Sequence, residues 1–338
     1  MHSSLARLGC FARACVSTAL PACGRGVVSQ RFQLMALAFV WICGWHGLAR
    51  GQILVSNPLN NTIGQWTTSG SAVNSSWITG LSGPDGIAVS GGYVYVANNA
   101  NSTIGKYTMS GQVVDASFIT AGMNGPTQIL ASGTDLYVMN VGNSTIGKYT
   151  TSGQTVNTAF ITLTQSYPYS MALSGTSLFV VAESQGSHSH SNSFVVEYNT
   201  ANGGFVGDVI PELPGSPPGF YGLAASAANL YVSFYYTNGY ISEYTTAGSL
   251  VTEKFIDNLK APQNLFLSGS SLYVLEIGSN RIGEYTTSGG TVNAALVTGL
   301  STPYNFTIAT VPEPSTYAMA LAGLACGGYV VFRRRKRA

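Results

Sequence analysis

Between residues 52 and 310 the chain alternates short apolar runs with turns rich in Gly, Ser, Thr and Asn. In one stretch, apolar Ile87–Val89 is followed by the turn Ser90-Gly91-Gly92 and then by the alternating run Tyr93–Asn98. Alternation with a period of two, bounded by Gly and Ser, predicts a pair of antiparallel strands. The same two-run pattern returns along the whole segment, so we expect an all-β architecture.

A third run repeats as a recognisable phrase, first seen as Ile63-Gly-Gln-Trp-Thr-Thr-Ser-Gly70. Its aromatic position is occupied by Trp66, Tyr107, Tyr149, Tyr198, Tyr244 and Tyr285, at steps of 41, 42, 49, 46 and 41 residues. A fourth run recurs as Trp77-Ile78, Phe118-Ile119, Phe160-Ile161, Phe205-Val206, Phe255-Ile256 and Leu296-Val297. Four strand-like runs in a period of about 40 residues are typical of a propeller blade.

The phase of the repeat predicts how the ring closes. The segment begins with a second-strand run at Ile53 and ends with a first-strand run at Phe306. The last strand therefore completes the blade that the first three strands open, which removes the exposed edges of an open array. We predict a six-bladed β-propeller of four-stranded blades over residues 52–310. Seven blades would need a repeat that the sequence lacks, and the phase disfavours an open solenoid.

Both ends of the chain have the features of export signals. Residues 1–51 read as a signal peptide: a long basic region, an apolar run over 34–45, and small residues before a cut ahead of Gln52. A retained N-terminal membrane anchor is the alternative, although 12 apolar residues fall short of the roughly 20 that a span needs. The extreme C-terminus, residues 311–338, combines Pro312-Glu313-Pro314, an apolar run over 317–332, and the basic block Arg333, Arg334, Arg335, Lys336 and Arg337.

This C-terminal arrangement resembles the PEP-CTERM sorting signal of Gram-negative bacteria. The resemblance implies a transmembrane sorting helix over 317–332, recognition by an exosortase, and delivery from the inner membrane to the cell surface or extracellular matrix. An ordinary C-terminal tail anchor is the alternative. The segment Gly83–Val89 followed by Tyr93–Asn98 also resembles NHL-like and gluconolactonase-like propellers, a resemblance that supports the fold more than any activity.

Composition and charge narrow the function further. Charged residues make up only 8% of the 338 residues, and all five cysteines lie outside the predicted propeller. Residues 52–311 carry five Lys or Arg residues against twelve acids, a formal charge of −7, which argues against a nucleic-acid partner. The middle segment has no cysteine nucleophile and no Gly-x-Ser-x-Gly elbow, so we expect no nucleophilic catalysis.

In such a propeller, the starts of the first strands and the ends of the second strands meet at one rim of the axial channel. The sequence places the following residues there: Asp85, Thr127, Tyr169, Tyr221, Gln263 and Tyr304 from the first strands, and Asn57, Asn98, Asn140, Glu183, Phe234 and Glu276 from the second strands. The lactonase-like resemblance implies a divalent metal such as calcium in the channel, with Asp85, Glu183 and Glu276 as candidate ligands. Polar residues that cap turns are the favoured interpretation, because hard cations need more carboxylates than the inner ring offers.

Two further features have alternative interpretations. His188 and His190 lie near Glu183 in a Ser-rich insertion, where they could hold zinc or copper, although an exposed loop without a ligand is favoured. The repeated aromatic of the third strand could stack on carbohydrate, although packing between blades is favoured. The predicted function is an exported, non-enzymatic surface or matrix module that binds exopolysaccharide or a surface protein. A metal-dependent hydrolase of the gluconolactonase type is the alternative.

Overall fold

The computed structural model describes residues 51–164, 166–184, 193–211, 219–235 and 237–310. The predicted signal peptide up to Arg50, the loop with His188 and His190, and the predicted sorting segment 311–338 lie outside the described residues. Within the described ranges, no helix is both long enough and apolar enough to cross a membrane.

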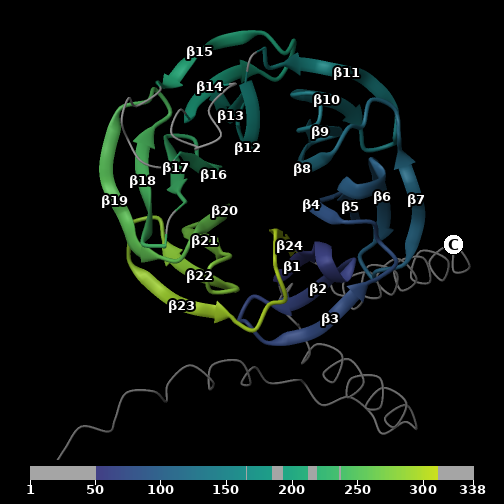
Figure 1. Cartoon of the computed structure of the whole chain (residues 1–338), viewed down its shortest axis with the longest axis horizontal. Coiled ribbons are helices and arrows are strands. Elements are labelled where there is room, and N and C mark those ends of the chain that lie inside the picture. The colour runs from purple at the N-terminus through teal and green to yellow at the C-terminus, as the bar shows by residue number, and fades with distance from the viewer. Residues whose placement is uncertain (1–50, 165, 185–192, 212–218, 236, 311–338) are drawn as a thin grey trace, which may run out of the picture. The chain divides into compact units, whose positions relative to one another are not determined.

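The described residues form six antiparallel four-stranded sheets around a central axis (Figure 1). The first sheet contains β24 (Asn305–Thr310), β1 (Gly51–Asn57), β2 (Thr62–Thr67) and β3 (Ala72–Ile78), with the short 3-10 helix η1 (Pro58–Asn60) after β1. The second contains β4 (Pro84–Ser90), β5 (Tyr93–Asn98), β6 (Thr103–Thr108) and β7 (Val113–Ile119), with η2 (Asn99–Asn101) after β5. The third contains β8 (Pro126–Ser132), β9 (Asp135–Asn140), β10 (Thr145–Thr150) and β11 (Thr155–Thr162), and the fourth β12 (Ser166–Ser174), β13 (Ser177–Ser184), β14 (Ser193–Asn199) and β15 (Phe205–Ile210). The fifth contains β16 (Phe220–Ala225), β17 (Asn229–Phe234), β18 (Gly239–Thr245) and β19 (Leu250–Leu259), and the sixth β20 (Pro262–Ser268), β21 (Ser271–Glu276), β22 (Arg281–Thr286) and β23 (Thr291–Val297).

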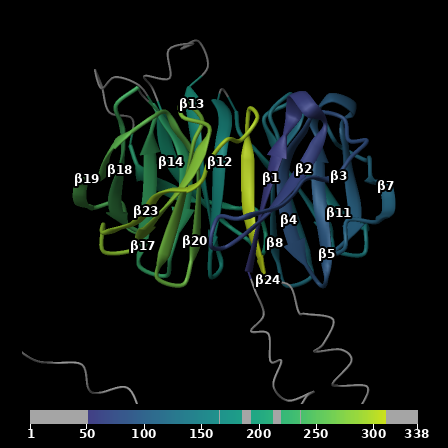
Figure 2. The ribbon, with the colours of Figure 1, turned by 90° about the horizontal axis from the view of Figure 1, so that it is seen from below.

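The ring closes through the blade that the two ends of the propeller share. β24 pairs antiparallel with β1, with Gly51 opposite Thr310 and Ser56 opposite Asn305 (Figure 2). The buried hydroxyl of Ser56 donates to the Asn305 carbonyl at 3.1 Å and accepts from the Asn305 N–H at 3.0 Å. The predicted six-bladed fold and its shared blade are confirmed. Gly51 and Thr310 lie at the end of the sheet opposite to Asn305, so the propeller's two ends leave from one face.

The repeated aromatic of the third strand packs between blades, as the favoured interpretation held. Trp66 lies in one buried cluster with Ile53 of its own blade and with Tyr273 and Leu275 of the neighbouring blade. The equivalent side chains Tyr107, Tyr149, Tyr244 and Tyr285 are all buried, and Tyr198 is half-buried with its ring edge-on to Phe205. The five buried rings are therefore unavailable for stacking on carbohydrate.

The Thr-x-Ser-Gly end of the repeated phrase forms the hairpin between the third and fourth strands. In the first blade, the Thr67 hydroxyl pairs with the Ser69 hydroxyl at 2.8 Å and accepts from the Ser71 N–H at 3.0 Å. Gly70 then takes a φ of +86°, which favours glycine. A Cβ on Gly70 would lie 1.8 Å from the carbonyl oxygen of Leu296 in the neighbouring blade. The phrase recurs because each hairpin must fit against the outer strand of the blade before it.

In the fourth blade, the outer strand departs from the residue equivalences that the repeat predicts. Ile78 pairs with Ile63 in the first blade, and the residue in the equivalent position of β15 is Ile210, which pairs with Val195. The predicted equivalents Phe205 and Val206 lie in the same strand but at its other end, where Phe205 pairs with Tyr198. The sequence assignment was four residues out of register because this strand carries apolar pairs at both ends.

The fit of the hairpin glycine to its neighbouring blade can be tested at Gly248. This residue has φ +84°, and a Cβ there would lie 1.8 Å from the Val209 carbonyl oxygen. We expect Gly248→Ala to lower the free energy of unfolding by roughly 2–5 kcal/mol, from the left-handed backbone and the overlap together. Urea unfolding of the full chain measures this. Gly133 has φ +58° with nothing within 4 Å of its Cβ position, so Gly133→Ala is the control and should cost about 1–2 kcal/mol. Equal losses in both variants would show that contact between the blades is unimportant.

Candidate functional site

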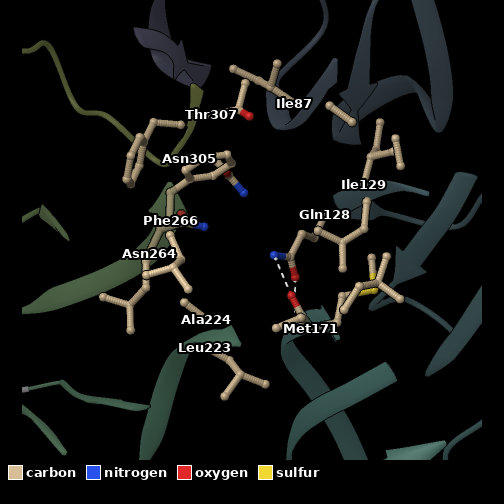
Figure 3. A pocket seen from close by; sticks show the side chains of 18 of the residues that line it. Ile87, Gln128, Ile129, Met171, Leu223, Ala224, Asn264, Phe266, Asn305 and Thr307 are labelled. Atoms are coloured by element: carbon tan, nitrogen blue, oxygen red, sulfur yellow. Dashed lines mark hydrogen bonds between the residues drawn. The ribbon is translucent and has the colours of Figure 1, made fainter. Parts of the chain in front are cut away.

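The first strands of all six blades line an axial cavity of about 270 Å³ (Figure 3). Apolar side chains such as Val89, Leu173 and Leu267 form much of its wall. The Gln128 amide lies across the gap between β8 and β12, where its Nε2 donates to the Met171 carbonyl at 3.1 Å and its Oε1 accepts from the Met171 N–H at 2.7 Å. These two bonds leave little of the Gln128 side chain for a ligand.

A second pocket, of about 250 Å³, lies at the end of the channel where the first strands begin. One residue from each blade surrounds this end, and we call the set the mouth ring: Asp85, Thr127, Tyr169, Tyr221, Gln263 and Tyr304. All of them except Asp85 line the pocket, together with Tyr167 and the amide side chains of Gln128, Asn264 and Asn305. The sequence placed every member of the mouth ring at this rim.

A repeated backbone irregularity positions the mouth ring. The pairing of the first with the second strand slips between Pro84 and Ile87, and an equivalent slip occurs in β8, β12, β16 and β20. The mouth-ring residue falls within the slip in each of these five blades, whereas Tyr304 lies just before β24, whose pairing with β1 has no slip. A β-bulge of this kind re-aims a side chain that regular pairing would direct to one face of the sheet. Sequence periodicity alone predicts strands there and gives no sign of the bulges.

The tyrosines of the mouth form a contiguous aromatic surface. The rings of Tyr169 and Tyr221 have centroids 5.2 Å apart, and Tyr221 stacks on Tyr235 at 4.9 Å with an interplanar angle of 28°. Tyr167 and Tyr304 are 40% and 38% exposed, so part of each ring faces solvent. Sequence reasoning missed Tyr167 and Tyr235, because the residue type at these two positions does not recur from one repeat to the next.

Glu183 is buried beneath this aromatic surface. The Tyr169 hydroxyl donates to Glu183 Oε2 at 2.5 Å. Desolvation, followed by this bond and the Glu183 charge, raises the pKa of Tyr169 above its ordinary value. The phenol therefore stays protonated at neutral pH and holds the carboxylate in place.

Asp85 is the one carboxyl group of the mouth ring, and its ionisation is strongly shifted. Its side chain is 7% exposed, and desolvation by burial raises the pKa of the carboxyl group to about 7. Desolvation also raises the pKa of Tyr304, and the nearby Asp85 and Tyr221 raise it further. Asp85 therefore changes charge near neutral pH, which is a property of general acids and bases as well as of buried structural carboxyls.

Glu276, another candidate metal ligand, is occupied by protein groups. Its side chain is fully buried, with Oε1 2.7 Å from Arg281 Nε and Oε2 2.7 Å from the Lys260 N–H. The equivalent residues of other blades play the same part: Asn98 accepts from the Ser82 N–H and Asn140 from the Asn124 N–H. These second-strand residues therefore cap turns at the rim, which is the role favoured from the sequence.

The structure does not bring the candidate carboxylates together as a metal site. Among the described residues, no group of three or more His, Cys, Asp or Glu side chains could hold a metal ion. Asp85, Glu183 and Glu276 are thus placed at one rim without forming a common ligand set. His188 and His190 lie outside the described residues, so the metal site that includes them stays a prediction.

Two residues that line the mouth pocket each have a buried oxygen atom without a partner among the described residues. Thr127 Oγ1 and Gln263 Oε1 belong to side chains that are 9% and 7% exposed, and neither makes a hydrogen bond within the described part of the chain. An unsatisfied buried acceptor costs free energy unless a ligand or water supplies a donor. Sequence reasoning placed both residues at the rim but had no means of showing that their oxygens were unused.

The comparisons with known proteins identify the C-terminal segment. Residues 310–336 match the family described as the PEP-CTERM protein-sorting motif. The chain carries a PEP-CTERM sorting motif. The match includes Pro312, Glu313 and Pro314 and the basic residues up to Lys336, and it begins at Thr310, the last residue of β24. The PEP-CTERM motif implies exosortase-mediated sorting and an exported, membrane-anchored precursor in a Gram-negative bacterium.

Beyond the PEP-CTERM segment, the comparisons bear on the fold alone. No curated protein matches the chain. Similar solved structures include a nidogen/laminin complex (TM-score 0.59, 13% identity, covering 77% of this chain and 98% of that one) and the hydrazine synthase of Kuenenia stuttgartiensis (0.58, 16%, 76% and 92%). A putative 6-phosphogluconolactonase from Bacteroides uniformis also matches (0.55, 14%, 78% and 100%). At these identities the likeness to all three shows a shared fold alone.

Burial of Asp85 predicts a specific pH dependence of stability. The folded protein holds this proton more tightly than the unfolded chain, where the Asp pKa is about 3.9. The stabilisation from neutral Asp85 is therefore complete below about pH 4, declines as the pH rises, and is lost above about pH 7. We expect Asp85→Asn to be more stable than wild type by about 2–4 kcal/mol at pH 8 and to differ little at pH 4, as measured by urea unfolding.

The control for this experiment is Asp257→Asn, because Asp257 is exposed on β19. Its substitution should leave the difference in stability between pH 4 and pH 8 unchanged. An Asp85→Asn variant that tracks wild type across this range would contradict the buried, proton-binding state of Asp85.

Proposed function

We propose that this protein is an exported binding or scaffold module that acts at the cell surface or in the extracellular matrix. The PEP-CTERM motif carries the proposal, because it supports delivery through an exosortase after a signal peptide has directed export. The proposed organisation is a signal peptide over 1–51, a propeller over 52–310 and a sorting segment over 311–338, with a transmembrane helix at 317–332 and a basic tail at 333–337.

The course of the chain supports a binding role for the mouth. Gly51 and Thr310 lie opposite one another in the shared blade, at the end of β24 away from Asn305. Asn305 lines the mouth pocket, so Thr310, the last described residue before the sorting segment, lies at the face opposite to the mouth. The attachment point of the sorting segment therefore does not cover the mouth.

The charge of the propeller supports a neutral or weakly basic partner. Residues 52–311 have a formal charge of −7, which disfavours nucleic acid, and polar Ser, Thr and Asn residues suit contact with an exopolysaccharide or a surface protein. Many copies on one surface would bind a polymeric partner at several points at once, so the overall avidity would exceed the affinity of a single contact.

A metal-dependent hydrolase of the gluconolactonase type is the second candidate. The observation in its favour is Asp85, a buried mouth-ring carboxyl whose pKa is raised to about 7, and the similar fold of a putative 6-phosphogluconolactonase is consistent with it. The ion pair of Glu276 with Arg281 weighs against it. Calcium, zinc or manganese should then raise the unfolding temperature of the full chain and activate lactone hydrolysis, with both effects reduced in Asp85→Asn. No thermal shift and no lactone turnover would eliminate the hydrolase.

The sorting role can be tested by replacing Pro312, Glu313 and Pro314 with alanine. In a host that has an exosortase, we expect wild type in the surface and matrix fractions and the triple variant in the inner-membrane fraction. Immunoblots of fractionated cells measure both. In the same host without its exosortase, wild type should behave like the variant. A triple variant that still reaches the surface would contradict sorting through this motif.

A further inference from the structure

We infer that the mouth pocket is a binding site for a single neutral sugar unit, held between tyrosine rings with its hydroxyl groups donating to Thr127 and Gln263. This inference rests on the proposed function and specifies its ligand class. It is carried by the unpartnered oxygens, the aromatic surface and the absence of cationic side chains at one pocket.

The unpartnered oxygens call for a ligand with hydroxyl donors. Only four buried side-chain N or O atoms lack a hydrogen-bond partner in the described ranges, and two of them, Thr127 Oγ1 and Gln263 Oε1, belong to residues that line this one pocket. Gln263 Oε1 can only accept a hydrogen bond, the Thr127 hydroxyl can accept or donate one, and both side chains are more than nine-tenths buried. A ligand that donates hydrogen bonds removes the cost of leaving them unsatisfied.

The order of the blades places these two acceptors on opposite sides of the mouth. Thr127 belongs to the third blade and Gln263 to the sixth, so three positions of the six-membered ring separate them. Tyr169 and Tyr221 lie between them on one side, and Tyr304 lies on the other. A flat ligand with donors at opposite edges and apolar C–H faces fits this arrangement, and a pyranose ring has both features.

The aromatic surface provides the contact for those faces. Tyr169 and Tyr221 are in tilted contact with centroids 5.2 Å apart, Tyr221 stacks on Tyr235 at 4.9 Å, and Tyr304 exposes 38% of its surface. Tyrosine offers a broad apolar ring with a polar tip at little entropic cost, which suits a ligand that is itself part apolar and part polar. Below the rings, the amides of Asn264 and Asn305 line both the mouth pocket and the axial cavity (Figure 3), where they can contact further hydroxyl groups.

The charge of the pocket selects a neutral sugar. The residues that line the mouth pocket in the described part of the chain include no Lys or Arg, and the buried carboxylate of Glu183 lies against Tyr169. An anionic sugar such as a uronate would meet no cation and would lie near this carboxylate, which is unfavourable in a desolvated site.

The experiment measures binding of neutral trisaccharides of glucose, galactose, mannose and N-acetylglucosamine to the full-length protein. The detergent must have a headgroup without sugar, so that it does not occupy the site. Saturation-transfer NMR detects binding and isothermal titration gives the dissociation constant. We expect at least one trisaccharide to bind.

Matched variants locate the site. Thr127→Val removes one acceptor with little change of shape and should weaken binding about 2- to 12-fold, the equivalent of one net hydrogen bond. Tyr304→Ala removes a stacking surface and should weaken binding by about tenfold. Ser242→Ala is the control: the Ser242 hydroxyl is also buried and unpartnered, but it lies outside the mouth pocket, so the affinity should not change. Unfolding temperatures near that of wild type would show that Thr127→Val acts on binding and not on folding.

Several results would overturn the inference. They are no binding by any trisaccharide, an affinity that survives both mouth variants, or equal weakening by Ser242→Ala. Calcium alone producing a titration signal that Thr127→Val and Asp85→Asn abolish would make the mouth a cation site instead. A failure to bind sugar would leave the proposed surface localisation intact. A failed localisation experiment would leave the sugar-binding measurement intact, so the two proposals are tested separately.

Discussion

Pairing of β24 with β1 is the contact on which the rest of the structure depends. It joins residues more than 240 positions apart, and the two hydrogen bonds between Ser56 and Asn305 are made at the mouth end of this ladder. Without the ladder, β1 and β20 would each lose a neighbouring inner strand, and the clusters shared by adjacent blades would open to water. Closure also fixes the diameter of the axial channel, because six first strands must meet around one axis. Both the cavity and the mouth ring therefore exist only in the closed ring.

Closure leaves one type of edge exposed, the outer strand of each blade. These strands carry exposed apolar side chains such as Val73, Val114 and Val292. The unpaired backbone groups of such a strand can form hydrogen bonds with a strand of another chain. Irregular pairing counters this: in the first blade the register shifts between Ile63 and Gln65, and the Asn74 side chain accepts from the Ser76 N–H at 3.0 Å. Equivalent contacts form at Asp115, Asn157 and Asn293. Bulged, locally capped edges are poor templates for further strands, which suits a protein proposed to act at high density on a surface.

β-Bulges also occur at the opposite edge of the blades, around the mouth. In five of the six blades a bulge in the first strand coincides with the mouth-ring residue, and the repeat supplies a uniform scaffold on which these positions vary. Tyrosine occupies three of the six positions, and Asp85, Thr127 and Gln263 occupy the others. In contrast, Asn98, Asn140 and Glu276 repeat a single structural contact at the ends of the second strands. The first-strand positions at the mouth thus vary in chemistry from blade to blade, whereas these second-strand positions repeat one turn-capping contact.

The number of blades, the shared closing blade and the membership of the mouth ring could be predicted from the sequence, because they follow from strand period and repeat phase. The sequence also determined the sorting segment, whose Pro312-Glu313-Pro314 motif, apolar run and basic block are local features. It misplaced the outer strand of the fourth blade, since Phe205-Val206 and Val209-Ile210 are equally apolar and only pairing with β14 distinguishes them. Only the tertiary structure decided that Glu276 binds Arg281, that Asp85 is buried enough to ionise near pH 7, and that Thr127 and Gln263 have no partner. Hydrogen bonding and desolvation depend on which atoms from distant blades come within a few ångströms of one another, and repeat periodicity carries no information about that.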